Sequence, residues 1–331
     1  VARVPDLVVF PESEDEVLGL VELAVEHGCC VIPYGGGTNV TDALRCPENE
    51  KRLIAYGLIL VAMMIALVVV APRLPALAQN AIPGAGPAAV GAVTGIGPYL
   101  HLVADLDRSL EFYQAVLGSV PTGTAEARAW GRNDPVVIMY GAAGAEIRTA
   151  TVPVPGSEMP VELVAFRGVA RARVQPRVFD PGAAVLLVFV RDISAALNAV
   201  TSHGGSVLTP GGQPVVVRDR NRFIIVRDPD GFFVELLQTD PLPAGATGGN
   251  VITGRFRTTA VNAEQTVRFY RDALGFALPD VGPLRDDPVL GGMTGLGVAR
   301  TRLVTGMVPG TAVPFEVLEF DQAERTRVRA D

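Results

Sequence analysis

Three glutamates occupy the same place in three similar strand-like runs, and their type and spacing could support chemistry. Glu162 follows Pro160-Val161, Glu235 follows Phe233-Val234, and Glu316 follows Pro314-Phe315. Side chains alternate between the two faces of a strand, so each carboxylate lies among apolar neighbours. There it needs a proton, a cation or a metal to offset its desolvation. Such a carboxylate can transfer protons or contribute to a metal site.

Turn and helix signals surround these runs. The strand-like run 223–226 leads into Asp228-Pro229-Asp230-Gly231, in which the proline presets φ and the glycine accepts a positive φ. This pattern predicts a β-hairpin that ends in the strand of Glu235. Three helix-like runs, 105–118, 192–205 and 262–275, begin with an N-cap residue and close on glycine.

The spacing of these signals predicts an internal repeat. The first and third helix-like runs share Phe-Tyr and Leu-Gly at the same offsets from their caps. Each helix-like run with its glutamate strand is interpreted as one module, and the first module matches the third better than the second. The repeating unit is therefore a pair of modules roughly 155 residues long. On this interpretation the chain stops halfway through its second pair.

These runs resemble the vicinal oxygen chelate superfamily, which includes glyoxalases, bleomycin-resistance proteins and extradiol dioxygenases. The resemblance covers about residues 95–331. It implies an α+β fold of tandem βαβββ modules: a paired-module cup at 95–241 and an unpaired third module at 250–331. An unpaired module would leave an open sheet edge, and self-association is expected there.

The resemblance also implies where a metal would bind, namely at one residue from the first and last strand of each module. The last-strand positions correspond to Glu162 and Glu235. The first-strand positions, seven residues before the helix caps, correspond to Pro98 and Val185, which cannot bind a metal. His101 is a candidate third ligand, although strand parity places it on the opposite face. We therefore expect no tightly bound metal, and a weak Mg²⁺ or Mn²⁺ site is left open.

Without a metal, one of the two carboxylates is expected to take up a proton through a raised pKa. In the third module Arg255 occupies the first-strand position, which predicts an ion pair with Glu316.

Residues 1–52 resemble a different family, the start of the FAD-binding domain of alkyldihydroxyacetonephosphate synthases and related flavin oxidases. An expected strand at 29–33 leads into a glycine-rich loop, whose candidate pyrophosphate contacts are Gly35, Gly36, Gly37, Thr38 and Asn39. The resemblance covers only the first strand-helix-strand and this loop. We therefore interpret residues 1–52 as a truncated fragment and do not expect it to bind FAD stably.

The segment 53–79 is strongly apolar. Leu53–Ala71 contains no charged residue and follows Lys51-Arg52, and Ala76-Leu77-Ala78 matches the pattern of a signal-peptidase site. A helix is expected, and a membrane anchor, an export signal made internal by a fusion and a buried core helix are all left open. The first two predict a membrane-anchored or exported protein. Residues 80–94 are expected to form an Ala/Gly/Pro linker.

Composition excludes some partners. The net charge is −7 and no Lys/Arg-rich face is evident, which argues against nucleic-acid binding. All three cysteines precede Lys51, the only lysine, so the regions on either side of about residue 50 are interpreted as having different origins.

Three functions remain after these exclusions. The pattern favours a metal-free protein that binds a small organic ligand in the cup. The alternatives are a metal-dependent lyase or dioxygenase, with Glu162 or Glu235 moving a proton, and a fragment of an FAD-binding oxidoreductase. Whether the protein is an enzyme is left open.

Overall fold

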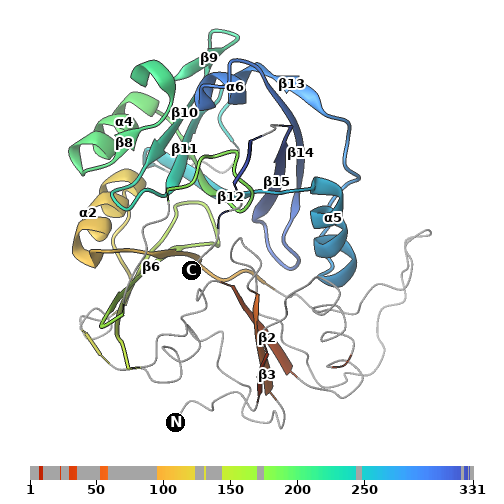
Figure 1. The fold of residues 1–331 in the computed structure, drawn as a ribbon. Coiled ribbons are helices and arrows are strands. Elements are labelled where there is room, and N and C mark those ends of the chain that lie inside the picture. The colour runs from red at the N-terminus through yellow and green to blue at the C-terminus, as the bar shows by residue number, and fades with distance from the viewer. Residues whose placement is uncertain are drawn as a thin grey trace.

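The computed structural model describes residues 7–9, 23, 30–35, 53–58, 95–123, 130–131, 144–169, 175–243, 248–321, 324–326 and 328. Helices and sheets occur together throughout residues 95–321, which confirms the predicted α+β class (Figure 1).

The described residues of the first module form one helix and three strands. Their bounds are β4 Tyr99–Leu102, α2 Leu106–Leu117, β5 Glu146–Val152 and β6 Val161–Arg167. The strands form a sheet in the order β4-β6-β5, with β4 parallel and β5 antiparallel to β6.

The structure describes more of the second and third modules. The second consists of β7 Ala184–Val190, α4 Ile193–Ser202, β8 Ser206–Val207, η1 Pro210–Gly212, β9 Val215–Val217, β10 Asn221–Arg227 and β11 Phe233–Gln238. The third consists of β12 Val251–Thr259, α5 Ala263–Arg268, the π-helical turn η2 Phe269–Ala273, β13 Arg285–Asp287, α6 Pro288–Thr294, β14 Ala299–Met307 and β15 Pro314–Phe320. The predicted hairpin of β10 and β11 is confirmed.

The predicted caps explain why the three main helices begin where they do. The side chain of Asp105 accepts hydrogen bonds from two backbone amides of α2, Asp192 does the same for α4, and Asn262 accepts one in α5. At the other end of α2, Gly118 has φ 66°, a left-handed conformation that glycine adopts without strain.

The second and third modules share one sheet. Its strand order is β13-β14-β15-β12-β7-β11-β10-β8, with a ninth strand, β9, paired to β10, and β7 pairs antiparallel with β12 along the line where the modules meet. The expectation that the third module is unpaired is therefore wrong, because it shares this sheet with the second module. The physical reason lies in β7, whose seven residues are all buried. Such a strand needs a hydrogen-bonded neighbour on each edge, and β11 and β12 provide them.

The nine-stranded sheet has two different faces. The face toward α4 and α5 packs Val188, Leu236 and Phe256 against those helices. The opposite face, called the cup face below, carries Phe233, Leu237, Leu318 and Phe320, and Leu290 and Met293 of α6 pack on it.

The first module is packed against the second through their helices, and α2 and α4 lie side by side (Figure 1). Gly205, just after α4, lies at this contact. A Cβ atom there would lie 2.7 Å from both Phe112 of α2 and Val200 of α4. The close approach of the two modules therefore depends on the absence of a side chain at residue 205.

A third sheet lies in the N-terminal region. It consists of β1 Leu7–Val9, β2 Cys30–Gly35 and β3 Leu53–Leu58, all parallel, in the order β1-β3-β2. The expected strands near residues 8 and 31 are confirmed. The expected helix over 53–71 is wrong for its first six residues, because β3 pairs with β1 on one edge and with β2 on the other.

The remainder of this apolar segment and the linker 80–94 lie outside the described residues. Among the helices that the structure describes, none is long and apolar enough to cross a membrane.

Substitution of Gly205 with alanine tests the contact between the first two modules. We expect the free energy of unfolding to fall by about 1–3 kcal/mol, because the added methyl group collides with Phe112, Val200 and the backbone. Chemical denaturation of the full chain measures this loss. Gly248→Ala is the matched control, since a Cβ atom there meets nothing within 4 Å. Equal stability of the two variants would contradict the prediction.

Candidate functional site

Glu162 lies in β6 on the face that points away from α2. Its neighbour Ala165 pairs with Arg148, whose side chain reaches Asp107 in α2, so by alternation Glu162 faces the other way. Glu162 is fully buried, and none of the described residues forms a hydrogen bond with either of its carboxylate oxygens. Burial raises its pKa to about 8. This residue is therefore a protonated carboxylic acid at neutral pH.

Glu235 lies on the cup face in a different environment. Its Oε2 accepts a hydrogen bond of 2.6 Å from Nη1 of Arg257 in β12. The Nε of the same guanidinium donates to Oε2 of Glu316 at 2.8 Å, and Nη2 of Arg255 lies 2.7 Å from Oε1 of Glu316. These four residues are called the charge quartet below. The predicted ion pair of Arg255 and Glu316 is confirmed.

The charge quartet pairs two arginines with two glutamates, and three of its four side chains are buried. The side chains of Glu235, Arg257 and Glu316 are 3%, 6% and 1% exposed, whereas that of Arg255 is 26% exposed. Burial opposes charge on Arg257, but the two carboxylates raise its pKa above the usual value, so the guanidinium stays charged. Burial raises the pKa of Glu235, an effect that Arg257 opposes.

The structure does not bring the predicted metal ligands together. Glu162 and Glu235 lie in separate sheets, and Glu235 contacts Arg257 rather than Glu162. Each glutamate lies on the face away from its own module's helix, and the two are in separate sheets. The raised pKa of Glu162 has burial as its cause, not a neighbouring glutamate.

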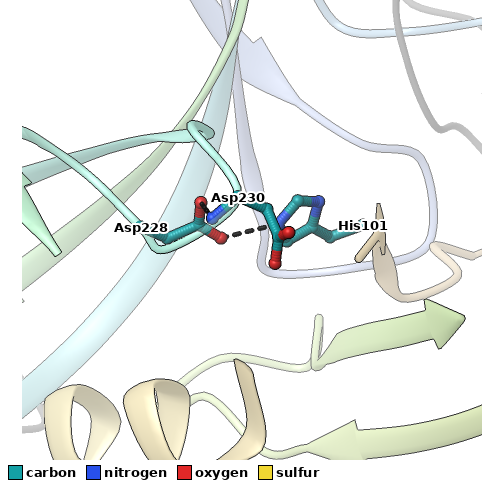
Figure 2. Close-up of side chains that lie close together, drawn as sticks. All are labelled: His101, Asp228 and Asp230. Carbon is teal, nitrogen blue, oxygen red and sulfur yellow. Dashed lines mark hydrogen bonds and ion pairs between the residues drawn. The ribbon is translucent and has the colours of Figure 1, made fainter. Parts of the chain in front are cut away.

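His101 takes part in a different cluster. It is fully buried, and its Nε2 lies 2.6 Å from Oδ2 of Asp228 in the predicted turn (Figure 2). The hydroxyl of Tyr113 donates to the same oxygen at 3.1 Å. Burial alone would raise the pKa of Asp228, but His101, the amide of Phe232 and Tyr113 together hold it below its usual value.

Asp230 extends this cluster toward α2. Its Oδ1 accepts from the amide of Ala104 and from Arg108, both at 3.0 Å, and its Oδ2 accepts from the hydroxyl of Ser109 at 2.7 Å. One oxygen from each of Asp228 and Asp230 and a ring nitrogen of His101 lie within 4.8 Å of one another (Figure 2).

The composition of this cluster is compatible with a weakly held divalent cation. However, the other oxygen of Asp228 accepts from the amides of Asp230 and Phe232, so every carboxylate oxygen already has a donor. A cation would have to displace these hydrogen bonds. The cluster therefore serves first to fasten the first module to the β10–β11 turn of the second.

Comparison with known proteins agrees with this fold. Residues 95–236 match the Glyoxalase/Bleomycin resistance protein/Dioxygenase superfamily. Over these residues the chain is similar to that superfamily. A protein described as a probable lactoylglutathione lyase, from Vibrio parahaemolyticus, is 27% identical over 157 residues, which are 46% of this chain and 98% of that protein. The crystal structure of glyoxalase I from Zea mays is 16% identical, with a TM-score of 0.42 and coverage of 68% of this chain and 67% of that one.

The N-terminal segment matches a second family. Residues 5–55 match an FAD-binding domain. Alkyldihydroxyacetonephosphate synthase from Caenorhabditis elegans is 52% identical over 54 residues, which are 16% of this chain and 9% of that protein. The chain thus spans about a tenth of the length of this relative. Gly35 ends β2, whereas residues 36–39 of the candidate pyrophosphate loop lie outside the described residues.

Sequence reasoning missed Arg257 and the role of the turn aspartates. Counting seven residues back from the helix caps selects Pro98, Val185 and Arg255. The strand register instead places Leu100, Leu187 and Arg257 directly beside Glu162, Glu235 and Glu316. An offset of five residues would have found Arg257. Asp228 and Asp230 were interpreted only as turn residues, because sequence gives no sign that they contact α2.

Substitution of Asp228 with asparagine tests the fastening cluster. We expect a loss of roughly 1–3 kcal/mol in the free energy of unfolding at pH 7, because His101 and Tyr113 lose a buried carboxylate acceptor. Since the pKa of Asp228 is lowered in the folded protein, the difference from the wild type should shrink as the pH falls through that value. Thermal unfolding between pH 3 and 7 measures this, with the exposed Asp286→Asn as control; a constant difference would contradict it.

The pKa of Glu162 predicts how stability depends on pH. The folded state keeps this proton up to about pH 8, whereas the unfolded state loses it near the ordinary value of 4.5. Between these values Glu162 makes folding less favourable by about 1.4 kcal/mol per pH unit. Glu162→Gln should remove this contribution and gain stability over the wild type as the pH rises. Exposed Glu158→Gln should follow the wild type, and parallel curves for all three proteins would exclude the raised pKa.

Proposed function

We propose that this protein binds a small organic ligand without a tightly bound metal, on the face of the first module that carries Glu162. The observation that supports this most directly is a fully buried carboxyl group that has no hydrogen-bond partner within the described part of the chain. An unsatisfied buried polar group lowers stability, so groups of this kind are worth examining as functional positions. A ligand could supply the missing partners.

The protonation state of Glu162 defines the chemistry of a suitable ligand. A protonated carboxyl group donates one hydrogen bond through its hydroxyl and accepts through its carbonyl oxygen. This pattern suits a ligand that bears a carbonyl and a hydroxyl group close together. Thr151 lies directly beside Glu162 in β5 and adds a partly buried hydroxyl to the same face. Leu100, on the other side, provides an apolar contact.

The residues beside Glu162 do not suit a tight metal site. Its register neighbours, Leu100 and Thr151, offer a hydrocarbon side chain and a neutral hydroxyl, and one carboxyl group alone seldom holds a divalent cation. In the second and third modules, a guanidinium already neutralises both glutamates. These observations support ligand binding through hydrogen bonds and apolar contact rather than through a resident metal.

A metal-dependent lyase is the second candidate. Its support is the His101, Asp228 and Asp230 cluster and the similarity to a probable lactoylglutathione lyase. Under this alternative, loss of the metal would abolish ligand binding. Substitution of Asp228 would weaken the binding of the metal and of the ligand. Under our proposal, chelation of metals would leave binding unchanged.

Ligand-observed NMR with hydroxyacetone and larger α-hydroxy ketones tests the proposal on the full chain in EDTA. We expect binding at pH 6–7 that weakens about tenfold one unit above the Glu162 pKa of about 8. Glu162→Gln should bind at every pH, because its amide also donates and accepts. Glu162→Met should not bind.

Glu158→Gln is the matched control, because this exposed glutamate lies four residues away and its substitution should change nothing. Binding that disappears in EDTA and returns with Mn²⁺ would favour the lyase alternative. Equal binding by wild type and Glu162→Met would overturn the proposed site.

A further inference from the structure

The three modules place a glutamate at the same point of their last strand but neutralise it differently. The strand register sets Glu162 beside Leu100, Glu235 beside Leu187 and Glu316 beside Arg257. Only one of the three first strands therefore provides a cation directly next to its glutamate. Since β7 and β12 are adjacent, that single cation can also reach the glutamate of the neighbouring module.

Arg257 lies between two carboxylates from different modules. Its Nη1 donates to Glu235 at 2.6 Å and its Nε donates to Glu316 at 2.8 Å. These are separate edges of one planar guanidinium, so a single side chain bridges both groups. The side chains of all three residues are at most 6% exposed. Water therefore contributes little to their neutralisation.

Arg255 completes the arrangement and indicates how solvent reaches it. Its Nη2 lies 2.7 Å from the second oxygen of Glu316, and its guanidinium lies over the ring of Phe189 at 4.8 Å. At 26% exposure, it is the member of the charge quartet that connects the buried carboxylates to the surface.

We propose that Arg257 is the built-in cation of this cup face, and that its removal leaves a site at Glu235 and Glu316 that binds a divalent metal ion. Two carboxylates that converge on one buried point require positive charge there. The guanidinium of Arg257 provides this positive charge as part of the protein itself, and it occupies the place that a metal ion would need. Without Arg257, the two carboxylates become oxygen ligands for a hard or borderline cation.

Titration with Co²⁺ tests this on the full chain, with calorimetry and visible absorption as readouts. Arg257→Met should bind one more equivalent of Co²⁺ than the wild type. This equivalent should be lost in both Arg257→Met/Glu235→Gln and Arg257→Met/Glu316→Gln. Arg257→Lys keeps a positive charge and should bind no more than the wild type.

Arg257→Met could fold poorly, because it leaves two buried carboxylates with less positive charge beside them. Refolding in Co²⁺ should then restore the cooperative unfolding transition, because the metal replaces the missing charge. A variant that stays unfolded with and without metal would overturn the proposal, as would a folded variant that binds no additional Co²⁺. Wild-type binding that is lost in Glu235→Gln would also overturn it.

Discussion

A carboxylate in the middle of a buried strand must be neutralised, and this constraint explains much of the arrangement of the second and third modules. Glu235 and Glu316 project onto the same face of one sheet, where water is largely excluded. The guanidinium of Arg257 reaches both because β7 and β12 are neighbours, so the pairing that joins the modules also brings the charges together. Packing and electrostatics here favour the same strand order.

The first module meets the same constraint differently. Leu100 lies beside Glu162 where Arg257 lies beside Glu316, so no guanidinium on the neighbouring strand reaches the carboxylate. Glu162 instead keeps a proton, which removes the charge but leaves its hydrogen-bonding capacity unused. Two copies of one structural position have thus become different chemical groups: a paired anion in the second module and a neutral acid in the first. This difference is our reason for locating ligand binding in the first module.

Local signals in the sequence predicted the elements well. The caps Asp105, Asp192 and Asn262 and the turn at 228–231 depend on interactions within a few residues, so residue types alone were enough to identify them. The pairing of modules could not be predicted in this way. A repeat shows which residues are equivalent, but not which strand edges meet, and that choice depends on the burial of β7 on both faces. The prediction of a helix from Leu53 was wrong for the same reason. An apolar run of six residues suits a strand when two neighbouring strands are available to pair with it.

The contact of His101 with Asp228 shows how strongly a site depends on residues that lie far apart in the sequence. Strand parity correctly turned its side chain away from the face of Glu162, but the residue that receives it, Asp228, is separated from it by 127 positions. The carboxylates of Asp228 and Asp230 accept from α2, from the end of β4 and from their own turn, so they could coordinate a metal only by releasing the contacts that hold two modules together. A cation at this cluster would therefore weaken the attachment of the first module. Glu162 has no such contacts to lose among the described residues, so a ligand that bound it would add hydrogen bonds without removing any of these.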